Sequence, residues 1–192
     1  MKLSKKEFGA MNNSFRRFLQ RSYEYPLFKK FGLAEKRKRI LEIGCGSGYG
    51  AALMAELEPS WYAGIDLMPE QVELARGRNL PGCEFEVMDA TDLSRFANGS
   101  VDAVVVFGIL HHIPEWRKVV GEIWRVLARG GKLFIEEPDG RFVAAWDRLF
   151  KWGHPVPGFR LSELEEVMKR TGFSIRKRRK MFGFGTYAAV KE

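Results

Sequence analysis

The chain has 192 residues, which suits one domain that buries roughly 70% of its unfolded surface. Its 45% hydrophobic content and five Trp exclude global disorder, and no apolar run reaches the ~18 residues that span a bilayer. Two cysteines without CxxC spacing, Cys45 and Cys83, exclude a disulfide framework and a zinc site. The net charge of +8 leaves nucleic acid, anionic lipid or an acidic substrate open as partners.

The start of the chain, residues 1–15, is charged and no continuous apolar stretch follows it, so we do not expect it to act as a secretory signal. We therefore expect a cytoplasmic protein without a metal site. Residues 7–33 carry apolar side chains at a mostly helical spacing. This segment predicts a helical cap, within residues 1–37, that lies over the sheet or covers the cleft.

From residue 39 onward, predicted strands and helices alternate. We expect strands at 39–44, 61–66, 83–88, 101–110 and 130–138, and helices at 48–59, 69–78 and 115–128. Pro69 suits the first turn of its helix. Strands separated by helices of about 10–15 residues predict right-handed crossovers and a parallel sheet, an α/β fold that is doubly wound.

The C-terminal part begins with an aromatic-rich stretch over 139–160. A helix is expected over 162–172, with Ser162 as N-cap, Glu165 completing a capping box and Gly172 as the stop. Residues 173–192 read as a closing β-hairpin. We see no internal repeat, so residues 1–192 are expected to form one domain, with a cofactor-binding core over 38–138 and substrate-side helices and the hairpin over 139–192.

The strongest functional signal is LEIGCGSGYG, residues 41–50. A predicted strand enters, Gly44, Gly46 and Gly48 follow at alternate positions, and a helix leaves. Glycine is needed where the backbone turns sharply and approaches a ligand without an intervening Cβ. The exposed amides at the start of the helix favour a negative or electron-rich ligand group.

Acidic residues follow the next two predicted strands. Asp66 comes directly after the second strand, where a carboxylate can accept hydrogen bonds from both ribose hydroxyls of an adenosine-type ligand. Asp89 closes the third strand, and alone it would be read as a turn or cap residue. Because strand ends at one edge of a parallel sheet line one crevice, Gly44, Asp66, Asp89 and Phe107 are expected to converge there.

The glycines alone do not exclude NAD, because GSGYGA from Gly46 also satisfies the G-x-G-x-x-G/A form. However, the segment from Glu42 to Gly48 resembles the acidic-x-Gly-x-Gly-x-Gly signature of class I S-adenosylmethionine methyltransferases. The resemblance continues through GIDLMPEQVELAR, MDATDL, VVVFGILHHIPE and IWRVLARGGKLFIEEP, and covers roughly residues 38–138. The last of these segments is typical of the small-molecule (methyltransferase type 11-like) subgroup.

This resemblance implies S-adenosyl-L-methionine as the cofactor and S-adenosyl-L-homocysteine as the product. It implies a mostly parallel seven-stranded sheet of order 3-2-1-4-5-7-6, with strand 7 antiparallel and helices on both faces. The cofactor-binding residues that it implies lie at the ends of the strands. Around the methionine and its amino group it implies Gly44, Cys45, Gly46 and Gly48, which also contact the ribose, together with Glu42, Phe107 and Gly108. Along the ribose and the adenine it implies Asp66 on the ribose, Leu67 and Met68 beside the adenine or ribose, and Asp89 and Ala90 on the adenine.

His111 and His112 follow the fourth predicted strand, where a general base would lie. Methyl transfer from a sulfonium is an in-line displacement, so a base is needed only when the acceptor must lose a proton. Neutral imidazole is available at physiological pH because histidine titrates near pH ~6.5. Either histidine could instead hydrogen-bond the loop backbone and position the turn at Pro114.

The acceptor is expected to be a small molecule, flat or apolar, held by residues 8–31 and 139–160. Trp146, Trp152 and Phe159 are candidate lid residues and His154 a weaker acceptor contact, although the aromatics could equally pack the helices onto the sheet. The place after the fourth strand reads FGIL. The Asn/Asp-Pro-Pro-aromatic motif of enzymes that methylate base amines or glutamine is therefore absent.

Three other functions stay open. The basic clusters, densest in RKRRK at 176–180, keep an RNA-directed methyltransferase or RNA-binding protein in view. If this run lies on a strand, alternation sends its charges to both faces. A non-catalytic cofactor-binding subunit that supports a partner is a second alternative, and a dehydrogenase is the third. The oligomeric state and the identity of the acceptor do not follow from the sequence.

Overall fold

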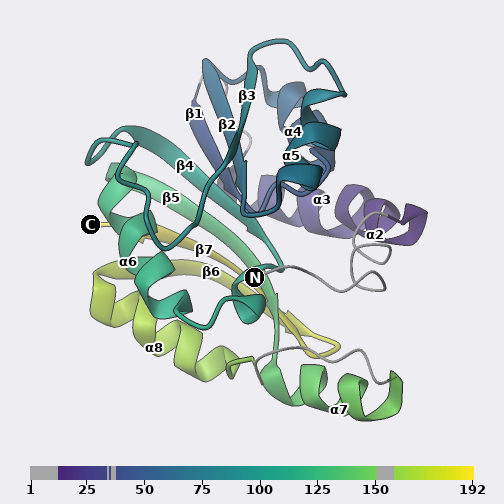
Figure 1. Ribbon diagram of the computed structural model, residues 1–192. Coiled ribbons are helices and arrows are strands. Elements are labelled where there is room, and N and C mark those ends of the chain that lie inside the picture. Colours follow the sequence, from purple (N-terminus) through teal and green to yellow (C-terminus); the bar gives the residue numbers. More distant parts are fainter. Residues whose placement is uncertain (1–12, 34, 36–37, 151–157) are drawn as a thin grey trace.

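The computed structural model describes residues 13–33, 35, 38–150 and 158–192. Its seven strands form one sheet in the order β3-β2-β1-β4-β5-β7-β6 (Figure 1). The strands are β1 Arg39–Ile43, β2 Trp61–Asp66, β3 Cys83–Val87, β4 Val101–Phe107, β5 Leu127–Pro138, β6 Phe173–Met181 and β7 Phe184–Lys191. Strands β1 to β5 pair in parallel, and β7 runs antiparallel to both β5 and β6. The predicted α/β fold, strand order and antiparallel strand 7 are confirmed.

Helices cover both faces of this sheet, as predicted. On one face, α3 Tyr25–Phe28, α4 Tyr49–Met54 and α5 Pro69–Arg76 pack on the sheet, and on the other face α6 Trp116–Val126 and α8 Leu161–Thr171 do so. Strand β4 lies in the middle and its side chains are nearly all buried, because both faces are covered. The Phe28 ring lies 5.1 Å from the Phe107 ring and 5.8 Å from the Phe134 ring, which fixes α3 on the sheet.

The described part of the N-terminal cap is a broken helical segment. It consists of α2 Ser14–Leu19, the π-helical turn η1 Gln20–Glu24, α3 and a second π-helical turn η2 Lys29–Leu33. Gly32, at φ 110°, interrupts the helix. Tyr25 and Phe28 are buried against the sheet, whereas α2 buries none of its residues completely. The cap therefore both covers the sheet and extends beyond it; residues 7–12 of the predicted helices lie outside the described residues.

Several predicted boundaries change. The helix expected over 48–59 is α4 followed by the 3₁₀ turn η3 Ala55–Leu57. The strand expected over 101–110 ends at Phe107, because Gly108 turns the chain at φ 62° and Leu110–His112 form the 3₁₀ turn η4. Pro69 is the first residue of α5, as expected.

The predicted capping of α8 is wrong. The helix begins at Leu161 with Arg160 in the N-cap position, so Ser162 lies within the first turn. The Leu161 N–H instead donates to the Asp139 carboxylate at 3.1 Å, and the Glu165 carboxylate contacts Tyr187 at 3.0 Å and Lys180 at 2.7 Å. A distant carboxylate thus replaces the local cap, whereas Gly172 ends the helix at φ 105° as predicted.

Residues 140–150 form a helix, α7 Gly140–Phe150, within the aromatic-rich stretch for which substrate-side helices were expected without bounds. The same Asp139 carboxylate accepts from the Arg141 N–H at 3.0 Å at the start of α7. The Phe142 ring packs against Phe184 at 5.2 Å and so joins α7 to the β6–β7 hairpin. Among the described residues, no helix is long and apolar enough to cross a membrane.

Candidate functional site

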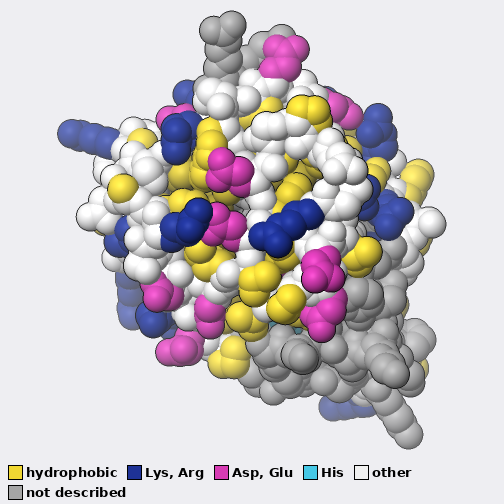
Figure 2. All heavy atoms as spheres, turned by 45° about the horizontal axis from the view of Figure 1, so that its top comes forward, with side chains coloured by type: hydrophobic (Ala, Val, Ile, Leu, Met, Phe, Trp, Pro, Cys, Tyr) yellow, Lys and Arg dark blue, Asp and Glu magenta, His cyan; other side chains and the backbone are white. Residues whose placement is uncertain are grey.

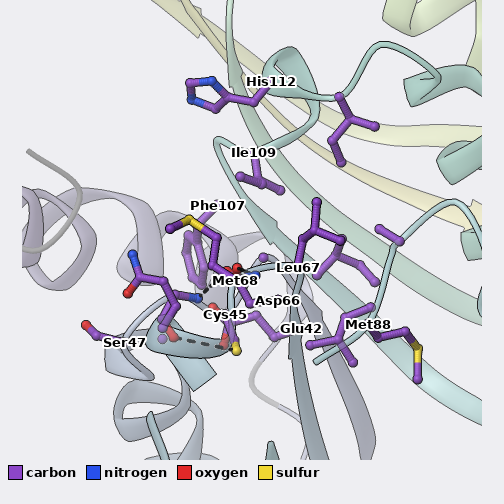
Figure 3. A pocket seen from close by; sticks show the side chains of 18 of the residues that line it. Glu42, Cys45, Ser47, Asp66, Leu67, Met68, Met88, Phe107, Ile109 and His112 are labelled. Atoms are coloured by element: carbon purple, nitrogen blue, oxygen red, sulfur yellow. Dashed lines mark hydrogen bonds between the residues drawn. The ribbon is translucent and has the colours of Figure 1, made fainter. Parts of the chain in front are cut away.

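A pocket of about 170 Å³ opens at the carboxyl ends of the parallel strands (Figure 3). The β1–α4 turn, the ends of β2 and β4 and the segment after β4 form it, and α2 and η1 contribute from the N-terminal cap. Figure 3 shows Glu42, Cys45, Ser47 and Asp66 around the turn, with Ile109 and His112 coming from the segment after β4. The predicted crevice at this sheet edge is therefore present.

The glycine turn is held against β2. The N–H groups of Gly44 and Cys45 both donate to the Ile65 carbonyl, at 2.8 and 2.9 Å, and the Gly48 N–H donates to the Cys45 carbonyl at 2.9 Å. All three glycines have positive φ, 71°, 51° and 75° at positions 44, 46 and 48. A Cβ on Gly44 would lie 2.7 Å from Ile109, so glycine is required both for the turn and for the close approach.

Asp66 joins the turn to the end of β2. One carboxylate oxygen accepts from the Gly46 N–H at 3.0 Å and the other from the Met68 N–H at 2.9 Å. Burial raises the pKa of the Asp66 carboxyl above its ordinary value, and the two amide hydrogen bonds oppose that shift. The carboxylate is thus fixed at the pocket wall, half-buried, between Gly46 and Met68.

Glu42 lies deep in the same pocket. It is almost completely buried on β1 and accepts a hydrogen bond from the Tyr62 hydroxyl. Burial raises the pKa of Glu42 from 4.5 to about 8, and the negative charge of Asp66 adds to this shift. Gly50 makes room for the carboxylate, because any Cβ at that position would collide with it. With a pKa of about 8, the Glu42 carboxyl group is mostly protonated and neutral at neutral pH.

This raised pKa predicts a pH dependence of stability. Between pH of about 4.5 and 8 the folded chain binds a proton at Glu42 that the unfolded chain does not. The stabilisation is fully present below the unfolded pKa and is lost as pH rises through about 8, with a slope of up to ~1.4 kcal/mol per pH unit. Urea unfolding from pH ~5 to ~9 should show this decline relative to Glu42→Gln, whose amide stays neutral. Parallel curves for the two proteins would contradict the assignment.

Asp89 and Ala90 line the pocket but lie beyond strand β3, which ends at Val87. The Asp89 side chain is exposed and accepts from the Thr91 N–H at 2.8 Å, forming a turn. This is the turn role that the sequence favoured for Asp89 taken alone. Its second oxygen and its position on the pocket wall still allow contact with a ligand.

A charged cluster at the end of β4 was missed by the sequence analysis. Arg16 of α2 pairs with Glu24 and reaches the Phe107 carbonyl with Nη2 at 3.4 Å. Glu136, on β5 opposite Phe107, is buried beside them, and burial together with the charge of Glu24 raises its pKa well above the ordinary value. Gly108 abuts this cluster rather than the pocket, and its N–H donates to the Glu136 carbonyl at 2.8 Å.

The two histidines have different surroundings. The His111 Nδ1 lies 2.8 Å from the Glu137 carboxylate, which also accepts from the N–H groups of Ile109 at 2.9 Å and Leu110 at 2.8 Å. The Glu137 carboxylate therefore holds the His111 ring against β5. The His112 ring lies against it, 4.0 Å between centroids, and lines the pocket. Only His112 of the pair faces the ligand space.

The structure gathers most of the predicted site residues in this one pocket. Those that line it are Glu42, Gly44, Cys45, Gly46, Asp66, Leu67, Met68, Asp89, Ala90, Phe107 and His112. Gly48, Gly108 and His111 lie behind it, among the residues that support its wall. The lining residues that the sequence analysis did not single out are Arg16, Gln20, Ile43, Ser47, Tyr49, Gly50, Ile65, Gln71, Met88, Ile109, Ile113 and Pro114.

The predicted lid residues behave differently from one another. Phe159 is buried and packs on Trp116, 4.4 Å between ring centroids, so it belongs to the core and is not a lid residue. Trp146 is partly exposed on α7 and stacks on Phe142 at 5.7 Å. Trp152 and His154 lie outside the described residues.

The basic run 176–180 lies on β6, and its charges do divide between the two faces. Arg178 and Lys180 pair with Glu165 of α8, at 3.5 and 2.7 Å. Arg179 points to the other face and lies over the Tyr23 ring of the cap, 5.6 Å away. On the face drawn in Figure 2, Lys and Arg side chains alternate with Asp and Glu side chains. Neither observation indicates a continuous basic patch.

Comparison with known proteins agrees with this architecture. The family described as "Methyltransferase domain" matches residues 41–135. A phthiotriol/phenolphthiotriol dimycocerosates methyltransferase of Mycobacterium leprae is 42% identical over 113 residues, 57% of this chain and 42% of that protein. A fatty-acid O-methyltransferase of Mycolicibacterium smegmatis is 36% identical over 114 residues, 58% of this chain and 41% of that protein. The chain thus spans about two fifths of the length of these curated relatives.

A solved S-adenosylmethionine-dependent methyltransferase from Aquifex aeolicus shares the fold. Its TM-score is 0.78 at 18% identity, over 98% of this chain and all of that one. The family match covers the glycine turn, the ends of β2 and β4 and the segment after β4, which form most of the pocket. The chain therefore belongs to the class I S-adenosylmethionine-dependent methyltransferases, in the type 11 subgroup.

Proposed function

We propose that this chain transfers a methyl group from S-adenosyl-L-methionine to a small, apolar acceptor. The observation that carries the proposal is that one pocket combines the glycine turn with Asp66 and Glu42 at one end and His112 at the other. The first three are the groups that hold the cofactor in this family, and the last lies where an acceptor would enter.

The side chains of the pocket suit that cofactor chemically. Three acidic residues, Glu42, Asp66 and Asp89, are spread along the pocket and can accept hydrogen bonds from an ammonium group, a ribose diol and an adenine amine respectively. Arg16 supplies a guanidinium for the methionine carboxylate. Leu67 and Met68 offer apolar surface to the ribose or the adenine.

When bound, the cofactor supplies an electrophilic methyl group for in-line displacement. The task of the chain is then to align the acceptor and to exclude water. Ile109, Ile113 and Pro114 line the acceptor end of the pocket with apolar side chains. The names of the two curated relatives point to lipid-like acceptors, which is consistent with such a lining.

His112 is the residue that we propose as proton acceptor, should the acceptor be a hydroxyl. Its ring lines the pocket, whereas Glu137 fixes the His111 ring from behind. His111 then acts as a positioning residue that supports the His112 ring by stacking. The imidazole of His112 would take the proton of the acceptor hydroxyl as its oxygen bonds to the methyl carbon, while the sulfur–methyl bond breaks and S-adenosyl-L-homocysteine leaves.

An acceptor screen with isotopically labelled S-adenosyl-L-methionine tests this proposal. Suitable probes are a long-chain alcohol, a long-chain fatty acid and a catechol. If the alcohol or the catechol is methylated, His112→Ala should lower kcat by roughly 10²–10⁴-fold, the usual contribution of a general base, with little change in cofactor affinity. His111→Ala should lower it less. If only the fatty acid is methylated, His112→Ala should leave kcat nearly unchanged, because that carboxyl group is already ionised at neutral pH. No transfer to any probe, or equal rates in His112→Ala and the unaltered protein with the alcohol or the catechol, would contradict the proposed acceptor class or the base.

RNA-directed action is the less favoured alternative. The densest basic run is divided between two faces and two of its side chains are paired with Glu165. A role as a non-catalytic partner subunit would leave cofactor binding intact and abolish transfer to every acceptor. NAD-linked chemistry has no separate observation in its favour.

A further inference from the structure

Large exposed apolar side chains of α2, α7 and the β6–β7 turn, together called the rim, lie at the end of the sheet at which the pocket opens. The hairpin turn between β6 and β7 lies at this end, because Phe184 pairs with Pro138, the last residue of β5. Helix α7 follows β5 directly, and α2 reaches the end of β4 through Arg16. Figure 1 shows α2, the hairpin turn and α7 together at the right of the view.

The exposed side chains of this rim are large. Phe15 and Phe18 of α2, Trp146 and Leu149 of α7 and Phe182 of the hairpin turn are 67%, 63%, 39%, 73% and 82% exposed. These are five of the eight large apolar side chains that the described part of the chain exposes. Isolated exposed apolar residues are ordinary, but a concentration at one end of a molecule indicates an interaction site.

Helix α7 packs against the β6–β7 hairpin, so the two form one continuous surface. Its Phe142 and Val143 face the body of the fold, with Phe142 packed on Phe184, and Asp139 donates its N–H to the Gly183 carbonyl at 2.7 Å. Trp146 and Leu149 then continue the apolar stripe outward, beyond the part that the sheet covers. The helix is thus amphipathic but buries only half of its apolar side.

Positive charges flank this stripe. Arg141 and Arg148 are both exposed, and at a spacing of seven residues they lie on one side of α7, next to Leu149. A helix with aromatic and aliphatic side chains on one side and arginines at its border lies readily at the surface of an anionic bilayer, with its apolar face among the headgroups. The net charge of +8 attracts the chain to the same surface.

From the rim's position, apolarity and flanking charge, we propose that it docks on an anionic lipid membrane, with Trp146, Leu149 and Phe182 entering the headgroup layer. The pocket would then open toward the bilayer, and an acceptor dissolved in lipid would reach it without crossing water. This inference rests on the surface of the chain and is independent of the proposed methyl transfer, although the two together define a membrane-facing enzyme.

The test is sedimentation of the full chain with vesicles of phosphatidylcholine alone and of phosphatidylcholine mixed with phosphatidylglycerol. We expect binding to the mixed vesicles, weaker binding to the neutral ones, and release by high salt. The double variant Leu149→Asn, Phe182→Asn should bind at least about tenfold more weakly, since it removes two apolar anchors. Asparagine suits position 182, where φ is 52°.

The matched control is Leu74→Asn on α5, which removes a 49% exposed apolar side chain at the opposite end of the strand order. It should bind vesicles like the unaltered chain. No binding to either vesicle, or equal loss in the control and the double variant, would overturn the inference. Cofactor affinity, measured in parallel, should be unchanged in both variants; its absence in the unaltered chain would count against the proposed function and not against membrane docking.

Discussion

Replacing Asp66 by alanine should weaken binding of S-adenosyl-L-methionine by about 1–3 kcal/mol, roughly 5- to 150-fold in Kd. The proposed partners of its carboxylate are the two ribose hydroxyls, which would lose their hydrogen-bond acceptor at the half-buried pocket wall. Removing the carboxylate also leaves the N–H groups of Gly46 and Met68 without the acceptor to which they donate at 3.0 and 2.9 Å. The glycine turn should therefore become less well ordered, adding to the loss.

Calorimetric titration of the two proteins with the cofactor and with S-adenosyl-L-homocysteine measures this difference. Asp92→Ala is the matched control, because Asp92 is exposed, accepts the Ser94 N–H in a similar turn at 3.0 Å and does not line the pocket. Its affinity should equal that of the unaltered chain. If Asp66→Ala also retained full affinity while remaining folded, the ribose assignment would be wrong.

Replacing Glu137 by alanine should destabilise the fold by about 3–5 kcal/mol, the cost of breaking a buried charged network by removing one partner. This side chain is completely buried and accepts from three backbone N–H groups, of Ile109, Leu110 and His111, and contacts the His111 ring. Without it, those donors would stay buried and unpaired, and each would add its own desolvation cost.

Urea unfolding followed by circular dichroism should show the loss as a lower midpoint. Glu163→Ala removes an exposed partner of Arg117 at 3.3 Å, so it should change stability by no more than ~1 kcal/mol. The segment 109–112 should also lose order in Glu137→Ala, which hydrogen exchange can locate. Equal midpoints for Glu137→Ala and the unaltered chain would show that β5 does not hold this segment.

The strand ends of the site were predictable because they follow from local pattern and topology. Gly44 to Gly48 lie between a strand and a helix, and Asp66 ends the next strand, so a parallel sheet necessarily brings them to one edge. The strand order itself came from the resemblance and not from spacing. Alternation on a strand also predicted the division of the basic run 176–180 correctly.

The parts that the sequence did not predict depend on contacts between distant segments. Arg16 reaches Phe107 across 91 positions of the chain, which no local spacing reveals. In the sequence, Glu136 and Glu137 look like the polar end of a strand. Successive side chains of a strand point to opposite faces, so Glu136 is buried beside Arg16 and Glu137 beside His111. The predicted cap at Ser162 failed for the same reason, because Asp139 supplies the carboxylate from 22 residues away.

The central claim is that the pocket takes S-adenosyl-L-methionine and not a dinucleotide. It is tested most directly by calorimetric titration of the purified chain with S-adenosyl-L-methionine, S-adenosyl-L-homocysteine and NAD under identical conditions. We predict micromolar binding of the first two, about −8 kcal/mol, and no measurable binding of NAD. Binding of NAD alone, or of none of the three by the folded chain, would contradict the account.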